Sequence, residues 1–162
     1  MILFFRPFSV GDYVEAGGIA GTVEEIQIFA TMFTTPDNKA VVVPNSSITG
    51  GNVINYSAKA ERRVDLVFGI GYDDDIKQAK EILERLVGAH EKILSEPAPT
   101  IAVLKLGDSS VDFAVRPWVK TADYWTVHFE LTEQVKLAFD AAGVTIPFPQ
   151  TDVHLHGANS AA

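Results

Sequence analysis

The chain contains no cysteine among its 162 residues. Disulfide bonds and cysteine-based zinc sites are therefore excluded, which agrees with a reducing compartment. The sequence also lacks an apolar run of the ~20 residues that a membrane-spanning helix requires. Its first residues do not form a signal peptide, because a charged segment and an apolar run of about 7–15 residues are both missing. We therefore expect the chain as given to be soluble.

Basic residues are also few: 13 lysines and arginines stand against 21 aspartates and glutamates, and the net charge is −8. Binding to a nucleic-acid backbone draws mainly on lysine and arginine, and the only adjacent basic pair is Arg62-Arg63. We therefore expect no nucleic-acid partner. The acidity itself has two interpretations: it keeps the chain soluble, or it creates a field that concentrates cations.

Residues 6–60 have the pattern of β structure. Gly17-Gly18 marks a turn, since glycine adopts positive φ without strain. Apolar side chains alternate from Ile26 to Phe33, which predicts one long strand, and residues 40–43 follow as its partner after a polar turn at 34–39. Residues 46–51 are a short polar segment, and 53–56 are typical of another short strand. Several short strands with glycine turns predict a small, strongly bent barrel.

Residues 61–149 have a different pattern, in the order strand, helix, strand, strand, helix, strand. This is the order of the split βαβ, or ferredoxin-like, unit (βαββαβ). Each helix carries one apolar stripe at three- and four-residue spacing, and a glycine follows each stripe as a stop signal. The first stripe is Ile76, Ala79, Leu83, Leu86 and Val87 before Gly88; the second is Val127, Leu131, Val135, Ala138, Phe139 and Ala142 before Gly143; the strands are expected near 64–70, 101–106, 111–115 and 144–146.

The last segment, residues 150–162, has one stretch in which Val153 and Leu155 alternate with polar residues. A single strand without a partner in its own domain is not stable alone. We therefore predict that Val153 and Leu155 belong to a strand that pairs with copies from other chains.

Few residues suggest chemistry. Asp73-Asp74-Asp75 could hold a divalent cation, but no further ligand lies at calcium-loop spacing, and an aspartate before a helix caps free amide groups. His154 and His156 could bind a metal between several chains, although a solvated pair is the simpler interpretation. His90 and His128 have no nucleophile arranged around them, so a catalytic triad is not supported. We predict capping by the aspartates, no catalytic, cofactor-binding or metal-binding residue, no cofactor and no enzymatic activity.

Several short motifs are spaced along most of the chain. They are Phe5-Arg6-Pro7-Phe8, Gly11-Asp12-Tyr13-Val14, Gly17-Gly18, Ala20-Gly21-Thr22-Val23, Gln27-Ile28-Phe29, Pro36 to Lys39, Val43-Pro44-Asn45, Gly51-Asn52, Tyr72-Asp73, Phe139-Asp140-Ala141-Ala142-Gly143 and Ile146-Pro147-Phe148-Pro149-Gln150. With these motifs the chain closely resembles the small-conductance mechanosensitive channel (MscS) family, and the resemblance covers about residues 4–155. The number and order of the motifs make a chance match improbable.

The resemblance implies an α+β fold with a small Sm-like β-barrel domain over residues 6–60. A ferredoxin-like (βαββαβ) α/β domain follows over 61–149. Residues 150–162 then contribute a strand to an intersubunit barrel and end in a disordered tail. Residues 1–5 resemble the stub of a pore-lining helix, with the transmembrane helices absent from the chain.

The first motif is where such a pore helix meets the body of the channel. Pro7 has no N–H to donate, so a helix cannot continue undisturbed there. The resemblance makes Phe5, Arg6, Pro7 and Phe8 candidates for coupling membrane helices to the body. Ser9 stands where some family members carry a second basic residue, so a two-arginine coupling scheme is not expected here.

The function implied by the resemblance is that of the cytoplasmic vestibule of a tension-gated ion channel. Such a channel is a homoheptamer in the inner membrane, held in the lipid bilayer by helices that precede this region, and it releases ions and small solutes on hypo-osmotic shock. Seven copies at −8 each would carry roughly −56 around one water-filled chamber, which would raise the local concentration of cations.

Two other functions remain as alternatives. One is a soluble RNA-binding protein built from an Sm-like barrel and a ferredoxin-like domain, since both are known to bind RNA; the net charge argues against it. The other is a metal enzyme that uses the aspartate run. The number and order of the motifs favour the channel.

Overall fold

The computed structural model describes residues 6–157. The chain divides into two compact units, residues 1–62 and 63–162, and each has its own hydrophobic core. We call them the β unit and the α/β unit. The predicted pore-helix stub at residues 1–5 and the last five residues, 158–162, lie outside the described part of the chain.

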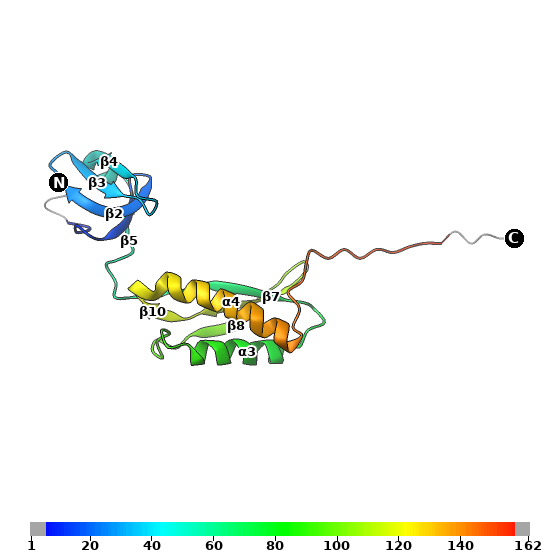
Figure 1. Cartoon of the computed structure of the whole chain (residues 1–162). Coiled ribbons are helices and arrows are strands. Elements are labelled where there is room, and N and C mark those ends of the chain that lie inside the picture. The colour runs from blue at the N-terminus through cyan, green and yellow to red at the C-terminus, as the bar shows by residue number, and fades with distance from the viewer. Residues whose placement is uncertain (1–5, 158–162) are drawn as a thin grey trace. The chain divides into compact units, whose positions relative to one another are not determined.

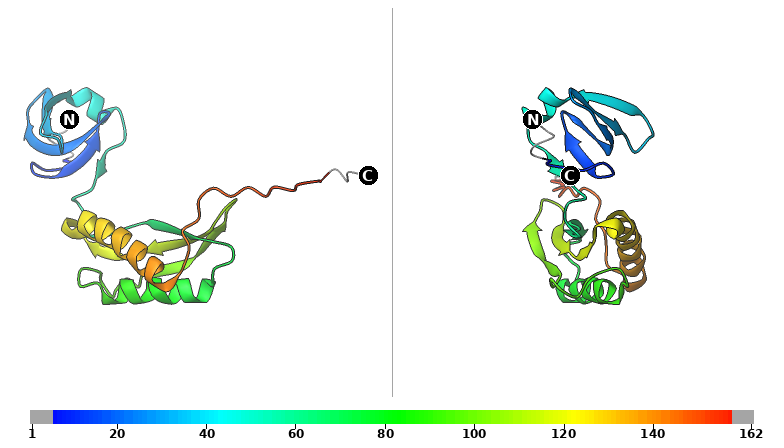
Figure 2. Two further views of the ribbon diagram at one scale, coloured as in Figure 1. Left: turned by 45° about the vertical axis from the view of Figure 1, so that its right-hand side comes forward. Right: turned by 90° about the vertical axis from the view of Figure 1, so that its left-hand side faces the viewer.

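The β unit is one antiparallel sheet of five strands in the order β4-β3-β2-β1-β5 (Figure 1). The sheet curls around its core, as a bent barrel requires (Figure 2). A short helix, α2, follows the edge strand β4. The elements are β1 Tyr13–Ala16, β2 Ile19–Ile26, β3 Ala30–Thr34, β4 Ala40–Pro44, α2 Asn45–Thr49 and β5 Ile54–Asn55.

Glycines make the bends of this sheet possible. Gly17 and Gly18 form the turn between β1 and β2 with φ values of 59° and 82°, the left-handed geometry that a two-residue hairpin needs. A Cβ on Gly21 would lie 2.8 Å from the carbonyl oxygen of Thr34. Only glycine therefore allows β2 and β3 to approach so closely at this point.

The predicted long strand from Ile26 to Phe33 is wrong, because the chain reverses inside it. β2 ends at Ile26 and β3 begins at Ala30, and the Gln27 N–H donates to the Ala30 carbonyl at 2.9 Å across the turn. Apolar residues continue through this turn, so the alternation alone does not reveal the break. The predicted pairing of the Ile26–Phe33 strand with residues 40–43 is confirmed for its second half, since β3 pairs with β4.

The core of the β unit is small. Phe33 is fully buried, and Phe8 packs against it with ring centroids 6.2 Å apart. The buried cluster is Phe8, Val14, Ala16, Val23, Phe33, Val43 and Ile48.

The α/β unit has a three-stranded antiparallel sheet in the order β7-β9-β8, with α3 and α4 packed against it (Figure 2). β6 and β10 form a separate two-stranded sheet. The predicted α+β class is confirmed, and so is the order strand, helix, strand, strand, helix. The elements are β6 Glu61–Arg63, β7 Leu66–Ile70, α3 Ile76–Ala89, β8 Thr100–Leu106, β9 Val111–Arg116, β10 Trp118–Lys120, a 3-10 turn at Thr121–Asp123 and α4 Tyr124–Ala142.

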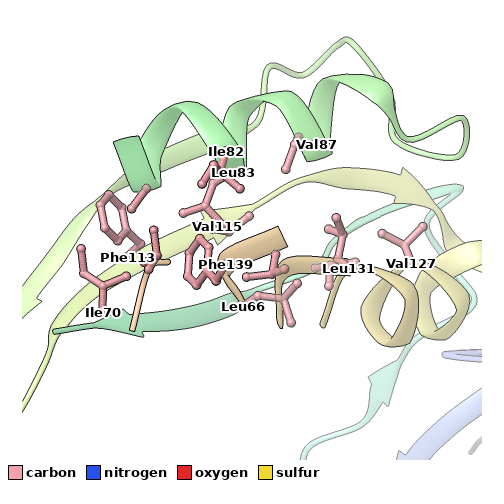
Figure 3. Close-up of a cluster of buried hydrophobic side chains, with 14 of the residues drawn as sticks. Leu66, Ile70, Ile82, Leu83, Val87, Phe113, Val115, Val127, Leu131 and Phe139 are labelled. Carbon is pink, nitrogen blue, oxygen red and sulfur yellow. The ribbon is translucent and has the colours of Figure 1, made fainter. Parts of the chain in front are cut away.

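The core of the α/β unit lies between the two helices and the sheet. Figure 3 shows Leu83 of α3 and Phe139 of α4 directed toward Val115 of β9 in the middle of this core. The buried cluster is Val64, Leu66, Ile70, Ala79, Ile82, Leu83, Val87, Val111, Phe113, Val115, Val119, Val127, Leu131, Val135, Phe139 and Val144.

The predicted ends and buried residues are correct for α4 but only partly correct for α3. α4 spans Tyr124–Ala142 and ends at Gly143 with a left-handed φ of 72°, as predicted. α3 runs past Gly88 to Ala89, so the predicted stop at that glycine is wrong. Its stripe also differs from the prediction: Ile76 is exposed, whereas Ile82, which was not predicted to be in the core, is buried.

The predicted strand at residues 144–146 is wrong, since no strand is assigned there. Instead, Thr145 lies beside the end of β7, where the Gly71 N–H donates to its carbonyl at 3.1 Å. Pro147 and Pro149 follow immediately, and proline has no N–H with which to extend a ladder of hydrogen bonds.

Candidate functional site

The segment from Arg6 to Phe8 is the described part of the predicted coupling site. Arg6 is exposed and has a positive φ of 34°. The Pro7 carbonyl accepts from Asn55 Nδ2 at 3.4 Å, and Phe8 is only 2% exposed in the core of the β unit. Phe5 lies outside the described residues. Phe8 and the Pro7–Asn55 hydrogen bond therefore attach this segment to the β unit, while its coupling role stays a prediction.

A polar network secures the start of β1 next to this segment. Asp12 Oδ2 accepts from the Ser9 N–H and from Asn55 Nδ2, both at 2.9 Å. The Tyr13 N–H donates to Ser57 Oγ at 2.9 Å. Segments more than 40 residues apart in the sequence are thus joined at this point, and the sequence pattern did not predict the contact.

Asn45 holds the turn between β2 and β3, which the sequence also did not predict. Its Nδ2 donates to the carbonyls of Gln27 at 2.9 Å and Ile28 at 3.0 Å. Its own N–H donates to the Phe29 carbonyl at 2.8 Å. Its Oδ1 accepts from the hydroxyl of Thr31 at 2.8 Å, and Thr31 is fully buried. The side chain and the backbone N–H of Asn45 therefore bind the carbonyls of all three turn residues, and Ile28 and Phe29 stay exposed at the tip.

Tyr56 connects β5 to β1. Its hydroxyl donates to Glu15 Oε2 at 2.9 Å, and this hydrogen bond raises the pKa of Tyr56 above its usual value of 10.0, with burial as a smaller cause. The Tyr13 ring lies 5.8 Å away, and the Arg62 guanidinium lies 4.9 Å over the Tyr56 ring. These contacts stabilise the end of the β unit where the chain leaves it.

The aspartate run caps backbone groups, as predicted. Asp75 is the N-cap of α3, and its Oδ1 accepts from the N–H groups of Lys77 and Gln78. Asp74 Oδ2 accepts from the Gly71 N–H at 2.9 Å and the Thr145 N–H at 2.8 Å. Within residues 6–157 no group of three histidine, cysteine, aspartate or glutamate side chains is arranged to hold a metal ion.

His90 links the two helices of the α/β unit. Its Nε2 lies 2.8 Å from Glu130 Oε2 on α4, and its Nδ1 accepts from the Lys92 N–H at 3.2 Å. The His90 side chain is 5% exposed, so it fills a structural position at the end of α3. His128 packs among the rings of Tyr124, Trp125 and Phe129.

The predicted tail residues extend into solvent. Val153 is 71% exposed and Leu155 is 90% exposed, and residues 150–157 have no assigned strand. A strand that pairs only with other chains has no partner within one chain, so the predicted intersubunit barrel stays a prediction. In the described part of the chain, none of the helices combines the length and apolarity needed to cross a bilayer.

Sequence comparisons identify the family of both units. The family model for the mechanosensitive ion channel β-domain matches residues 1–58. The model for the C-terminal part of the mechanosensitive ion channel MscS matches residues 64–146, half of the chain. The chain belongs to the MscS family. The division between the β unit and the α/β unit falls in the short gap between the two matches.

Two relatives and one solved structure illustrate how far the similarity extends. The small-conductance mechanosensitive channel of Edwardsiella ictaluri is 46% identical over 158 residues, which are 98% of this chain and 55% of the relative. An uncharacterised MscS family protein of Synechocystis is 46% identical over 96% of this chain and 52% of the relative. The crystal structure of Helicobacter pylori MscS in its closed state has a TM-score of 0.90 and 33% identity, over 97% of this chain and 62% of that one. The chain thus spans about half the length of the curated relatives it matches.

Proposed function

We propose that this chain is the cytoplasmic part of a tension-gated mechanosensitive channel that releases ions and small solutes on hypo-osmotic shock. The observation that supports it best is the identity of 46% to a small-conductance mechanosensitive channel over nearly the whole chain. In this proposal the complete protein lies in the inner membrane, with helices before this region lining the pore. The mechanism is an equilibrium between closed and open packings of those helices, which membrane tension shifts through their difference in area.

The chain contributes a scaffold and a vestibule, with no catalytic residue or cofactor in the proposed mechanism. Seven copies form a homoheptamer: the β units make a ring, the α/β units enclose a chamber, and Val153 and Leu155 lie in a barrel of tail strands. Arg6, Pro7 and Phe8, with Phe5 before them, couple the pore helices to the ring. The net charge of −8 on each copy raises the concentration of cations in the chamber, since fields of one sign concentrate counter-ions.

The test is to express the complete reading frame in a bacterial strain that lacks its own mechanosensitive channels. We expect survival of hypo-osmotic shock and a tension-activated current in membrane patches. Residues 1–162 expressed alone are the matched control and should give neither. A complete protein that reaches the membrane but produces no current under tension would contradict the proposal.

A further inference from the structure

We propose that the α/β units of neighbouring copies contact each other through two unlike surfaces, the α4 surface of one copy and the β8 edge of the next. The α4 surface consists of Trp125, Phe129 and Glu133, and the β8 edge consists of Leu104, Lys105 and Leu106. The inference rests on the proposed homo-oligomer and names the residues that hold its α/β units together.

The α4 surface is an aromatic patch that the chain leaves uncovered. Trp125 is 59% exposed and Phe129 is 64% exposed, one helical turn apart on the outer side of α4. Their rings stack with centroids 5.6 Å apart and planes 29° apart. Contiguous exposed aromatic groups are uncommon on monomeric proteins and are enriched where proteins associate.

The β8 edge is an aliphatic strip on a strand with one open side. β8 pairs only with β9 in the described sheet, and Leu104 and Leu106 are 50% and 69% exposed. Long edge strands are usually protected by charges, proline or a covering segment. Thr100–Leu106 carries a single charged residue, Lys105. An apolar, seven-residue edge with one charge is suited to being covered by another protein surface.

Each surface also carries one charge, and the two charges are opposite. Glu133 follows Phe129 by one helical turn on α4, and Lys105 lies between the two leucines of β8. Both side chains are exposed, and neither takes part in an ion pair within residues 6–157. The α4 surface therefore has an acidic side chain at one end, while the β8 edge carries one basic side chain.

A second copy of the chain is the partner that these observations favour. The two surfaces differ in chemistry and carry opposite charges, and every copy presents both. α4 and the lime-green strand β8 lie on opposite sides of the α/β unit in the second view of Figure 2. A contact between two different surfaces of identical subunits is heterologous, and such contacts give a ring when the rotation between neighbours closes and an open filament when it does not. Each copy would then have one neighbour at α4 and another at β8.

The absence of cysteine makes the arrangement directly testable by cross-linking. Phe129→Cys and Leu106→Cys are introduced together, and the purified 162-residue chain is treated with a short bifunctional maleimide. We expect a ladder of covalent multimers beyond the dimer on a denaturing gel. Each single variant should give no ladder, because equivalent residues do not meet in a heterologous contact. The matched control pairs Leu106→Cys with Ile76→Cys, since Ile76 is 43% exposed on α3 outside the proposed contact.

A second test uses charge and needs no change in the apolar residues. Glu133→Lys and Lys105→Glu should each raise the concentration of half-assembly about ten-fold, because like charges then face each other across the contact. The double variant, with both charges reversed, should have a concentration of half-assembly within about three-fold of that of the unmodified chain. Light scattering measures all four proteins, and circular dichroism checks that each one is folded.

The outcomes separate this inference from the function on which it rests. A multimer seen by light scattering, without the Phe129–Leu106 ladder and without charge rescue, would overturn the surface assignment and leave the oligomer in place. Equal cross-linking of the Ile76–Leu106 control would overturn it as well. A chain that stays monomeric at every concentration and forms no ladder would overturn both the surfaces and the proposed assembly by this region.

Discussion

The two units of this chain are held together by different means. The α/β unit packs two amphipathic helices against a sheet around a large, continuous apolar cluster. The β unit has a much smaller cluster and closes its sheet with side-chain hydrogen bonds from Asn45, Asn55 and Asp12. A small domain buries too little apolar surface to rely on it alone. Polar contacts at fixed points therefore determine the shape of the β unit more than they do in its larger neighbour.

Charged side chains are also distributed unequally between the two units. Residues 40–58, which include β4, α2 and β5, contain no charged side chain. Val42 and Ile54 on the two edge strands are nevertheless 61% and 47% exposed. In the α/β unit the exposed side of α3 carries charged side chains of both signs. The uncharged surface of the β unit is suited to contact with neighbouring subunits, in agreement with the proposed ring.

The largest effect should come from removing one buried phenylalanine from each core. Phe33→Ala in the β unit and Phe113→Ala in the α/β unit should each cost about 3–5 kcal/mol, since both rings are fully buried. We expect Phe33→Ala to unfold the smaller β unit while the α/β unit stays folded. Both tryptophans, Trp118 and Trp125, lie in the α/β unit, so tryptophan fluorescence during urea unfolding follows that unit alone.

The same experiment tests whether the two units unfold independently. Circular dichroism reports on both units, and its change at low urea should appear in Phe33→Ala without a change in fluorescence. Simultaneous loss of both signals in Phe33→Ala would mean that the units unfold as one, and that their separate cores do not make them independent.

A smaller effect is expected from Asn45→Ala. The substitution leaves the Thr31 hydroxyl without its partner and frees the carbonyls of Gln27 and Ile28. An unsatisfied buried polar group costs about 1–3 kcal/mol, so the β unit should lose that much stability and the α/β unit none. Urea unfolding followed by circular dichroism measures the loss.

Asn52→Ala provides the control for this prediction, because Asn52 is an exposed asparagine of the same unit. We expect its unfolding midpoint to match that of the unmodified chain. Equal stability of Asn45→Ala and Asn52→Ala would show that the hydrogen bonds of Asn45 are replaced by water at no cost, and that the apolar cluster alone stabilises the β unit.

The smallest effect concerns pH. The hydrogen bond to Glu15 raises the pKa of Tyr56, so the folded state holds the phenolic proton more tightly than the unfolded state does. This contribution to stability is complete below pH 10 and is lost as the pH rises through the higher native pKa. Stability of the β unit should therefore fall more steeply above pH 10 in the unmodified chain than in Tyr56→Phe. Urea midpoints between pH 8 and about 11 give the comparison, and parallel curves for the two proteins would contradict it.

Local periodicity predicted the helices and hairpins because each depends on neighbours a few residues away. α4 shows this best: its buried residues Val127, Leu131, Val135 and Phe139 repeat every four positions, and Gly143 ends the helix with a positive φ. β8 and β9 likewise form near the residues where strands were expected, and they pair with each other. For these elements the pattern, the stop signal and the packing agree.

Local periodicity failed where a long-range contact decides the structure. The alternation of apolar residues continues unbroken through Gln27–Phe29, and the turn there depends on Asn45, which lies 17 and 18 residues away from the two carbonyls it binds. The strand expected at 144–146 failed for a related reason. Thr145 makes its contacts with Gly71 and with the cap residue Asp74, and Asp74 lies 71 residues away in the sequence.

The sequence by itself determined the two-part organisation, the amphipathic helices and the absence of disulfides, because these follow from composition and from the spacing of apolar residues along the chain. The tertiary structure alone decided which polar side chains hydrogen-bond within the β unit, which backbone groups the aspartates bind, and which apolar residues remain exposed. Burial and hydrogen bonding depend on segments distant in sequence coming together, so Trp125, Phe129 and Leu106 can be recognised as uncovered only once the rest of the α/β unit is packed.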